Sequence, residues 1–402
     1  MLKGLNTIIT NLESFIRPVS RFFNKISSVL LFIMPLPVLF DVVSRLTVKG
    51  SLPGGIEIEE FFMLFVVYFG IGFTQIDEGH IRIDLITSRF PEWLQNVLNT
   101  FVYLISTWLF FLLTYLLVKT GVGKLHHGEL SFALAIPIWP FWFFAALGVL
   151  VLAFTVLLDF LKALQKSVEG RSRVSLVIAL AIGCFLIIAP MFMFLPMGLS
   201  GASIGILGMI FLFVLLFLGM PIGFGMGFTG FLGMIIVYNG LGPAFGNLAI
   251  GSYSTAASYM LTVVPLFVLM GEFAYQSGIS QDLFTTANIW LGRLRGGLAM
   301  SSVAGCSGFA AVCGDSLATA VTMGTLAIPE MKKKKYSMRL ATGCLAAGGT
   351  LGILIPPSVG FIFYAIVTEE SIGRLFIAGL IPGLLLAVLF MLTIFVMAVI
   401  NP

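Results

Sequence analysis

The sequence predicts an all-α, polytopic membrane protein. Of its 402 residues, 59% are hydrophobic and only 10% are charged, and the mean hydropathy is +1.08. Apolar stretches of about 20 residues recur along the chain, which is the length that a helix needs to cross the hydrocarbon of a bilayer. Such a composition excludes a soluble domain. Lys and Arg gather in short stretches between the apolar ones, which indicates orientation in a bilayer and no nucleic-acid partner.

The first part of the chain is predicted to hold four spans. An amphipathic helix over 2–24 is expected on the cytoplasmic face, without a cleavable signal. The spans follow at about 27–46, 58–76, 97–118 and 137–160. Lys and Arg are more frequent at the two ends of this unit than in its opposite loops, which predicts a cytoplasmic N-terminus.

Charged residues inside these spans favour a structural interpretation. Asp41 and Arg45 are four residues apart, so they can pair along one helical face, joined by Glu59 or Glu60 from the next span. We favour an ion-pair cluster over a proton relay.

A polar connector at 161–173 marks the predicted domain boundary. Further spans are expected at about 174–195, 202–219, 221–238 and 259–276, with a polar stretch, 243–258, outside the lipid and an interfacial segment over 278–298. A final pair crosses outward from Met338 and returns over 374–399. The count is nine full spans and one re-entrant hairpin.

The run from 301 to 358 is apolar but interrupted twice. Around 313–316, Cys-Gly-Asp-Ser splits it into two pieces of about a dozen residues, each too short to cross a bilayer, which predicts a re-entrant helical hairpin. Helix breakers at 348–352 and 355–358 interrupt the next segment. They predict a broken transmembrane helix.

Unwound backbone at membrane depth is tolerated only where protein buries it or where it lines a watery cavity. Freed carbonyl groups suit a cation, and the N-termini of half-helices suit an anion. The two interruptions therefore predict one coupling-ion and substrate site of a secondary transporter. The alternative, that the glycines only permit close helix packing, leaves Asp315 and the double proline unexplained.

No enzyme or metal centre is expected beyond a coupling Na⁺. The cysteines, Cys184, Cys306, Cys313 and Cys344, and the three histidines show no ligand spacing. The sequence also has no nucleophile–base set and no P-loop.

Several motifs together resemble the membrane part of a tripartite ATP-independent periplasmic (TRAP) transporter, with its small and large subunits fused. For the small subunit these are the Glu59-Glu60 pair and the stretch Gly79-His80-Ile81-Arg82-Ile83-Asp84. For the large subunit they are Gly219-Met220-Pro221-Ile222, 265–272, 314–323 and 341–358.

The resemblance implies a sodium-driven, elevator-type importer of small organic acid anions, of the dicarboxylate, keto acid or sugar acid class. A periplasmic binding protein would deliver the solute, and the bacterial inner membrane would hold the chain. The implied domains are a small-subunit domain over 1–165, a connector and linking span over 166–198, and a large-subunit domain over 199–402.

The family's site maps onto the two interruptions. The cation-binding residues implied are Gly314, Asp315, Ser316, Gly349, Thr350, Gly352 and Pro356, and the substrate-binding residues are Ser307, Ser316, Thr319, Pro357 and Ser358. The family more often has Ser where Asp315 stands. Because a carboxylate at membrane depth is costly unless it binds a cation, is protonated or faces water, we predict that Asp315 contributes to cation binding.

The family's large subunit contains two inverted repeats, whereas this sequence shows one hairpin and one broken helix. The resemblance therefore implies either a large subunit truncated after its first repeat or a separate polypeptide that supplies the second. One rival hypothesis is a membrane scaffold that binds partners but does not transport. A channel with the hairpin as its filter is disfavoured, because a filter usually needs rotational symmetry about a pore.

Overall fold

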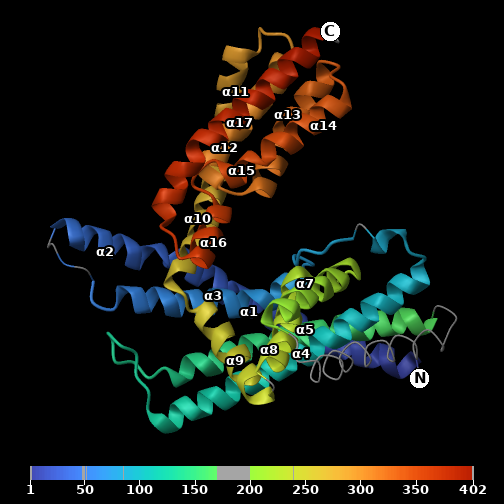
Figure 1. Ribbon diagram of the computed structural model, residues 1–402, viewed down its shortest axis with the longest axis vertical. Helices are drawn as coiled ribbons and strands as arrows, with labels where there is room; N and C mark the ends of the chain where they lie inside the picture. The colour runs from blue at the N-terminus through green and yellow to red at the C-terminus, as the bar shows by residue number, and fades with distance from the viewer. Residues whose placement is uncertain are drawn as a thin grey trace. The chain divides into compact units, whose positions relative to one another are not determined.

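The computed structural model describes residues 2–47, 50, 52–84, 86–169, 200–238 and 240–400. The regular secondary structure of the described residues is α-helical apart from a short 3-10 helix at Thr87–Arg89 and one isolated bridge between Leu130 and Pro137. This confirms the all-α membrane class. The predicted linking span at 174–195, with Cys184, lies outside the described residues. The chain divides into two compact units, Met1–Ser258 and Tyr259–Pro402 (Figure 1).

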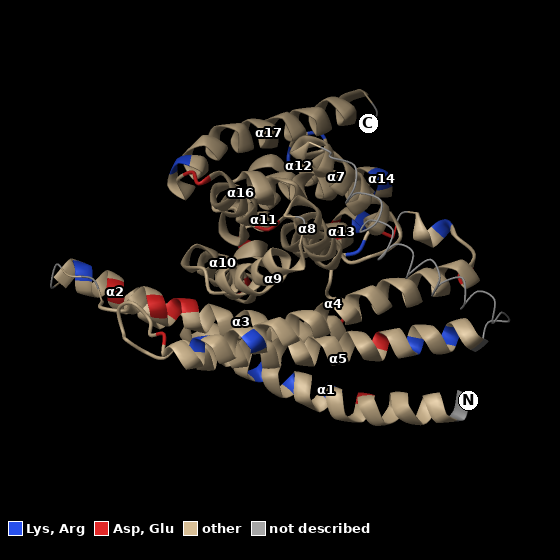
Figure 2. Ribbon diagram, turned by 60° about the horizontal axis from the view of Figure 1, so that its bottom comes forward, with Lys and Arg blue, Asp and Glu red and all other residues tan. Residues whose placement is uncertain are grey.

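Five described helical segments are long and apolar enough to cross a membrane. They are Gly4–Thr47, Glu92–His127, Trp139–Val168, Tyr259–Gln276 and Ile372–Ile400. A sixth is counted if Met338–Leu354 and Val359–Thr368, bent by 41° at their break, form one span. Charged residues are sparse along these helices (Figure 2). The chain is a multi-pass membrane protein, and the count of nine spans stays a prediction.

The start of the chain differs from the predicted boundary near Lys25. Instead of a separate amphipathic helix over 2–24, α1 (Leu2–Ile33) continues for 32 residues, and α2 (Pro35–Thr47) follows after Met34. Proline lacks an N–H and fits the first turn of a helix. Pro35 therefore ends one helix and begins the next.

The first unit is built around α3 (Gly55–Ile76), α4 (Glu92–His127) and α5 (Trp139–Glu169), which pack on one another and on α1. Close approach needs a small residue in α5, since a Cβ on Gly148 would lie 2.3 Å from the Tyr68 carbonyl oxygen. The aromatic rings of Trp142 and Tyr253 stack with centroids 4.0 Å apart. This stacking joins α5 to α9, in the polar stretch predicted over 243–258.

The helices α7 (Gly201–Phe217), α8 (Ile222–Val237) and α9 (Leu241–Ala256) also belong to the first unit. Both α8 and α9 contact α4. Gly219, with φ of 88°, makes the predicted tight turn between α7 and α8. The compact units thus divide at 258, whereas the predicted domains divide near 165 and 199 and remain a prediction from the sequence.

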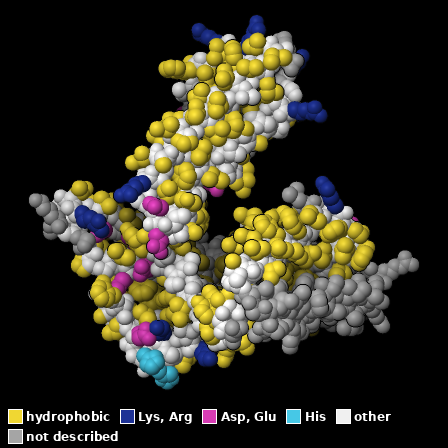
Figure 3. Space-filling model, viewed as in Figure 1, with side chains coloured by type: hydrophobic (Ala, Val, Ile, Leu, Met, Phe, Trp, Pro, Cys, Tyr) yellow, Lys and Arg dark blue, Asp and Glu magenta, His cyan; other side chains and the backbone are white. Residues whose placement is uncertain are grey.

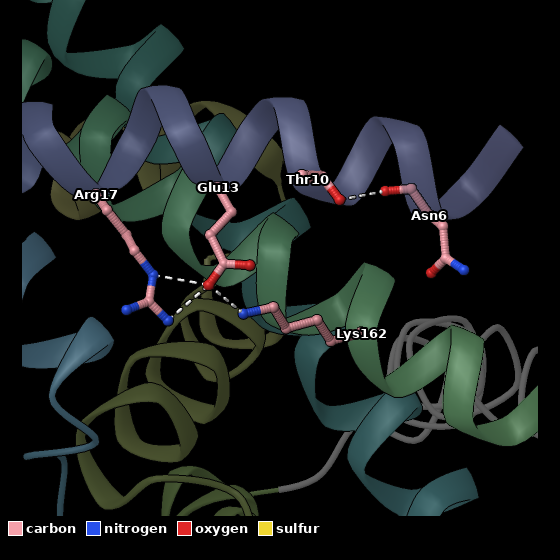
Figure 4. Close-up of polar contacts among 5 residues, drawn as sticks. All are labelled: Asn6, Thr10, Glu13, Arg17 and Lys162. Atoms are coloured by element: carbon pink, nitrogen blue, oxygen red, sulfur yellow. Dashed lines mark hydrogen bonds and ion pairs between the residues drawn. The ribbon is translucent and has the colours of Figure 1, made fainter. Parts of the chain in front are cut away.

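Two of the ion-pair groups in the described part of the first unit bear on its packing and on the sequence predictions. The predicted pair is confirmed, with Arg45 Nη2 2.8 Å from Asp41 Oδ2. A second cluster joins α1 to the end of α5, because Glu13 Oε1 accepts from Arg17 and, at 2.9 Å, from Lys162 Nζ (Figure 4). On the same helix, the Thr10 hydroxyl donates to the Asn6 carbonyl at 2.8 Å.

The second unit surrounds one helix. Its elements are α10 (Tyr259–Gln276), α11 (Ile279–Leu291), α12 (Gly297–Cys313), α13 (Ser316–Lys333), α14 (Met338–Gly349), α15 (Leu351–Leu354), α16 (Val359–Thr368) and α17 (Ile372–Ile400). Of these, α10, α11, α13, α14, α15 and α17 contact α12 (Figure 1). Small residues let these helices approach α12 closely. One example is Gly348 of α14, where an added Cβ would lie 2.9 Å from the Cys306 sulfur of α12.

Candidate functional site: the junction of hairpin and broken helix

The predicted hairpin is formed by α12 and α13. Gly314 has φ of 67°, in the left-handed region that favours glycine, and Asp315 caps the next helix. The arms have 17 and 18 residues, not about a dozen as predicted. The predicted arms were too short at both outer ends. The first arm, α12, begins at Gly297, inside the predicted interfacial stretch, and the second, α13, continues past Pro329 into the lysine run.

The broken helix has its break at the prolines. The backbone at Thr350 keeps helical angles, φ −63° and ψ −20°, so α14 and α15 are nearly continuous. The chain leaves the helix at Ile355, where ψ is 121°, and α16 begins at Val359. The interruption predicted at 348–352 is therefore a slight irregularity, and the true break lies at 355–358.

The double proline explains which backbone groups are freed. Pro356 and Pro357 have no N–H, so the carbonyl groups of Gly352 and Ile353, four residues earlier, lose their helical donors. Ser358 restores one of these bonds, because its buried hydroxyl donates to the Ile353 carbonyl. The Gly352 carbonyl has no such side-chain donor among the described residues.

The hairpin tip lies directly on this break. The Val359 N–H donates to the Gly314 carbonyl at 3.1 Å. A Cβ on Gly314 would lie 2.4 Å from the Pro357 carbonyl oxygen, and one on Gly352 would lie 2.4 Å from that of Asp315. A Cβ on Gly349 would lie 2.6 Å from the Ala320 Cβ. The two interruptions thus form one structure, called here the junction (residues 313–316, 349–352 and 355–359).

Four helix ends meet at the junction. The C-termini of α12 and α15 present carbonyl groups, and the N-termini of α13 and α16 present N–H groups. The former carry partial negative charge and the latter partial positive charge. One place therefore brings together carbonyl groups, the kind that bind a cation, and N–H groups, the kind that bind an anion, and some of them bond to one another.

Polar side chains at the junction form hydrogen bonds with backbone groups at the starts of α13 and α16. Asp315 Oδ1 accepts from the Ala318 N–H at 2.7 Å, and the buried Thr319 hydroxyl donates to the Asp315 carbonyl at 2.6 Å. Ser358 accepts from the Phe361 N–H at 3.4 Å. The second carboxylate oxygen of Asp315 makes no hydrogen bond within the described part of the chain, so it is available to a ligand.

Two predicted site residues lie apart from the tip. Ser307 is seven residues before Gly314 on α12, about 10 Å along the axis, and donates to the Val303 carbonyl at 2.9 Å. The exposed Thr350 donates to the Ala347 carbonyl at 2.6 Å. Each hydroxyl group thus bonds to a carbonyl group of the preceding turn.

Sequence reasoning missed the glycines of α10 and α17 that support the junction. A Cβ on Gly271 would lie 3.1 Å from the Cys313 sulfur, and one on Gly383 would lie 2.8 Å from Ile355 Cγ1. Gly271 precedes Glu272, an exposed carboxylate that accepts from Gln276 at 2.9 Å. Within the motif at 265–272, the Gly271-Glu272 pair is the sequence feature that could have pointed to α10 as part of the junction.

A cation at this place would be held by oxygen ligands. No group of three or more His, Cys, Asp or Glu side chains lies together among the residues that the structure describes. The junction instead offers carbonyl groups, hydroxyl groups and one carboxylate. Oxygen atoms of these kinds are the ligands that hard cations prefer.

The fold and the junction define a multi-pass helical membrane protein whose polar site is made of interrupted helices. The chain belongs to the tripartite ATP-independent periplasmic transporter family and joins its two membrane components. The model of the DctQ component matches residues 34–166, and that of the DctM component matches residues 209–401.

Curated relatives show the same relationship. The chain is 27% identical to the sialic acid TRAP transporter permease protein SiaT of Haemophilus influenzae over 363 residues, which are 87% of this chain and 57% of that protein. It is 43% identical to the C4-dicarboxylate TRAP transporter large permease protein DctM of Pseudomonas aeruginosa over 152 residues, 38% of this chain and 36% of that protein.

A third relative, 36% identical over 134 residues, is the isethionate TRAP transporter permease protein DctMQ of Oleidesulfovibrio alaskensis. The match covers 33% of this chain and 21% of that protein. The chain thus spans about half the length, or less, of these relatives. These relatives are permeases, so the chain is similar to transport proteins and not to enzymes.

Proposed function

We propose that this chain is the membrane component of a sodium-coupled secondary importer of small organic acid anions, in the bacterial inner membrane with its N-terminus in the cytoplasm. A periplasmic binding protein would deliver the anion, of the dicarboxylate, keto acid or sugar acid class. Two of the relatives are named as C4-dicarboxylate and sialic acid permeases, which supports an acid as the solute.

The observation that carries the proposal is the meeting of four helix ends at the junction. Na⁺ would bind among carbonyl groups at the ends of α12 and α15, with the free oxygen of Asp315. The anion would face the N–H groups that begin α13 and α16. A bound Na⁺ and a bound anion at neighbouring helix ends would attract each other, so each ion would raise the affinity for the other. Such mutual dependence is the basis of coupled transport.

The junction lies within one compact unit, Tyr259–Pro402. Every contact described for it joins residues of this unit. The site can therefore move as one body without being taken apart. This supports the elevator-type movement that the family resemblance implies.

The test is uptake of labelled organic acids into proteoliposomes that contain the full chain, in the presence of their binding proteins and an inward Na⁺ gradient. Uptake that collapses when K⁺ replaces Na⁺ is the expected result. The assay is repeated with a polypeptide that carries the second repeat, because the family resemblance implies that such a repeat would supply further ligands.

Two outcomes would overturn the proposal. Uptake that is indifferent to the replacement of Na⁺ would remove the coupling ion. Binding of the periplasmic protein without uptake, with and without the second polypeptide, would favour the membrane scaffold instead.

A further inference from the structure

The second unit contains a groove of about 1020 Å³ that the junction residues do not line. Both α14 and α17 contact α12, and these three helices supply its apolar walls. The wall residues that matter here are Val303, Leu340, Ala347, Phe390, Ile394 and Met397.

The mouth of the groove is positively charged. Arg295, Lys334, Lys335 and Arg339 line it, and no Asp or Glu does. All four cations are exposed, and none pairs with a carboxylate within the described residues. Lys and Arg side chains gather at this end of the unit, where α17 ends (Figure 3).

Apolar walls together with a cationic mouth favour an amphiphilic ligand with a negatively charged head group. A free phosphate would use the cations but leave the apolar walls in water, and a purely apolar ligand would leave the cations without a partner. The volume is at the upper limit of small-molecule pockets, roughly 300–1,000 Å³. From Arg339 to Ala347 the groove follows α14 for about 12 Å, which accommodates the upper part of an acyl chain.

We propose that this groove binds an anionic phospholipid, with its phosphate at Arg295, Lys334 and Arg339 and an acyl chain against α17. Basic pockets between helices on the cytoplasmic side bind acidic headgroups, and the cytoplasmic leaflet is rich in them. The sequence places the lysine run on that side. The lipid site is independent of the solute that the junction carries.

The first experiment measures lipid binding to the full chain, purified in a mild non-ionic detergent and stripped of lipid. Thermal unfolding is followed with added phosphatidylglycerol, phosphatidylcholine of the same acyl chains, glycerol phosphate or inorganic phosphate. Phosphatidylglycerol is expected to raise Tm and to bind about tenfold more tightly than phosphatidylcholine. The two soluble phosphates are expected to have no effect.

A charge-matched pair of double variants locates the site. Lys334→Gln with Arg339→Gln removes two cations of the mouth and is expected to lower the affinity for phosphatidylglycerol about tenfold or more. Lys332→Gln with Arg293→Gln removes two exposed cations outside the groove and is expected to leave that affinity nearly unchanged. All four side chains are exposed, so both proteins should fold.

A second pair of variants tests the apolar wall. Met397 lines the groove, whereas its exposed neighbour Val396 does not. Met397→Glu should abolish the rise in Tm caused by phosphatidylglycerol, and Val396→Glu should preserve it.

Four results would overturn the proposal. They are equal binding of the two lipids, equal losses in the two double variants, an equal rise in Tm with inorganic phosphate, or self-association of the chain that the Lys334 and Arg339 changes abolish. The third would indicate a soluble anion, and the last a second copy of the chain in the groove.

Discussion

The α-carbon of Gly352 lies against the carbonyl group of Asp315, so that a Cβ added to this glycine would lie 2.4 Å from the carbonyl oxygen. Both groups belong to the main chain, so neither can relieve a clash by changing its rotamer as a flexible side chain would. This contact holds the hairpin tip on the broken helix. It makes Gly352 the sharpest test of the junction.

Gly352→Ala is expected to separate the two segments and to lower stability by about 1–3 kcal/mol, as overpacking does elsewhere. Thermal unfolding of the purified protein measures the loss. Gly343→Ala, on α14, is the control, because a Cβ there meets no atom within 4 Å. Equal Tm values for the two variants would show that the tip does not press on Gly352.

Substitutions at Asp315 separate its role as a helix cap from its charge. Asn caps helices as well as Asp does, whereas Ala costs about 1 kcal/mol. Asp315→Asn should therefore keep Tm but weaken the Na⁺ dependence of uptake, and Asp315→Ala should lower both. Na⁺ dependence and a pH profile of uptake left intact in Asp315→Asn would exclude a role of the charge in cation binding.

Ser358→Ala is expected to destabilise the break by about 1–2 kcal/mol. The buried hydroxyl both donates to the Ile353 carbonyl and accepts from the Phe361 N–H, and its removal leaves both groups without that partner. Ser358→Thr, which keeps a hydroxyl, should restore most of the loss in a thermal unfolding measurement. Thr368→Ala provides the control, since this exposed hydroxyl serves only its own helix; a similar loss there would refute the assignment.

The stability of the first unit is expected to fall in mild acid. Burial, with a smaller contribution from Arg82, lowers the pKa of His80, and its Nε2 has no hydrogen-bond partner among the described residues. The folded chain therefore protonates this imidazole only at a lower pH than the unfolded chain, which takes up the proton as the pH falls past about 6.5. The contribution to stability is complete above that pH and is lost as the pH falls toward the lowered pKa.

Tm measured between pH 8 and pH 5 tests this expectation. His80→Gln should flatten the profile, whereas changing the exposed His126 and His127 to Gln together should not. A profile that falls as steeply in His80→Gln as in the parent protein would assign the acid sensitivity to other groups.

The sequence predicted the hairpin from the interruption at 313–316 and the broken helix from the helix breakers at 348–352 and 355–358. It also predicted unwound backbone at Gly349 and Gly352, where the helix is nearly continuous; their predicted role in cation binding stays a prediction. Glycine serves both unwound backbone and close helix contact, and only the position of the facing segment distinguishes the two. Here Ala320 and Asp315 face these glycines, so they serve contact.

The ends of individual helices and the boundary between the two compact units were harder to predict. The lysines after Met331 indicate a membrane surface but give no helix end, and α13 continues to Lys333. The membership of α8 in the first unit depends on contacts such as that of His80 with Phe224, whose ring centroids are 5.0 Å apart. Residues 144 positions apart carry no local signal of this contact.

The bond from the Val359 N–H to the Gly314 carbonyl joins main-chain atoms only. No replacement of the valine except proline removes it, and the side chains around it can change without loss of the link. The junction therefore combines a constant backbone frame with a replaceable lining. Such a division would let the side chains that line the junction be exchanged while the attachment of the hairpin to the broken helix is kept.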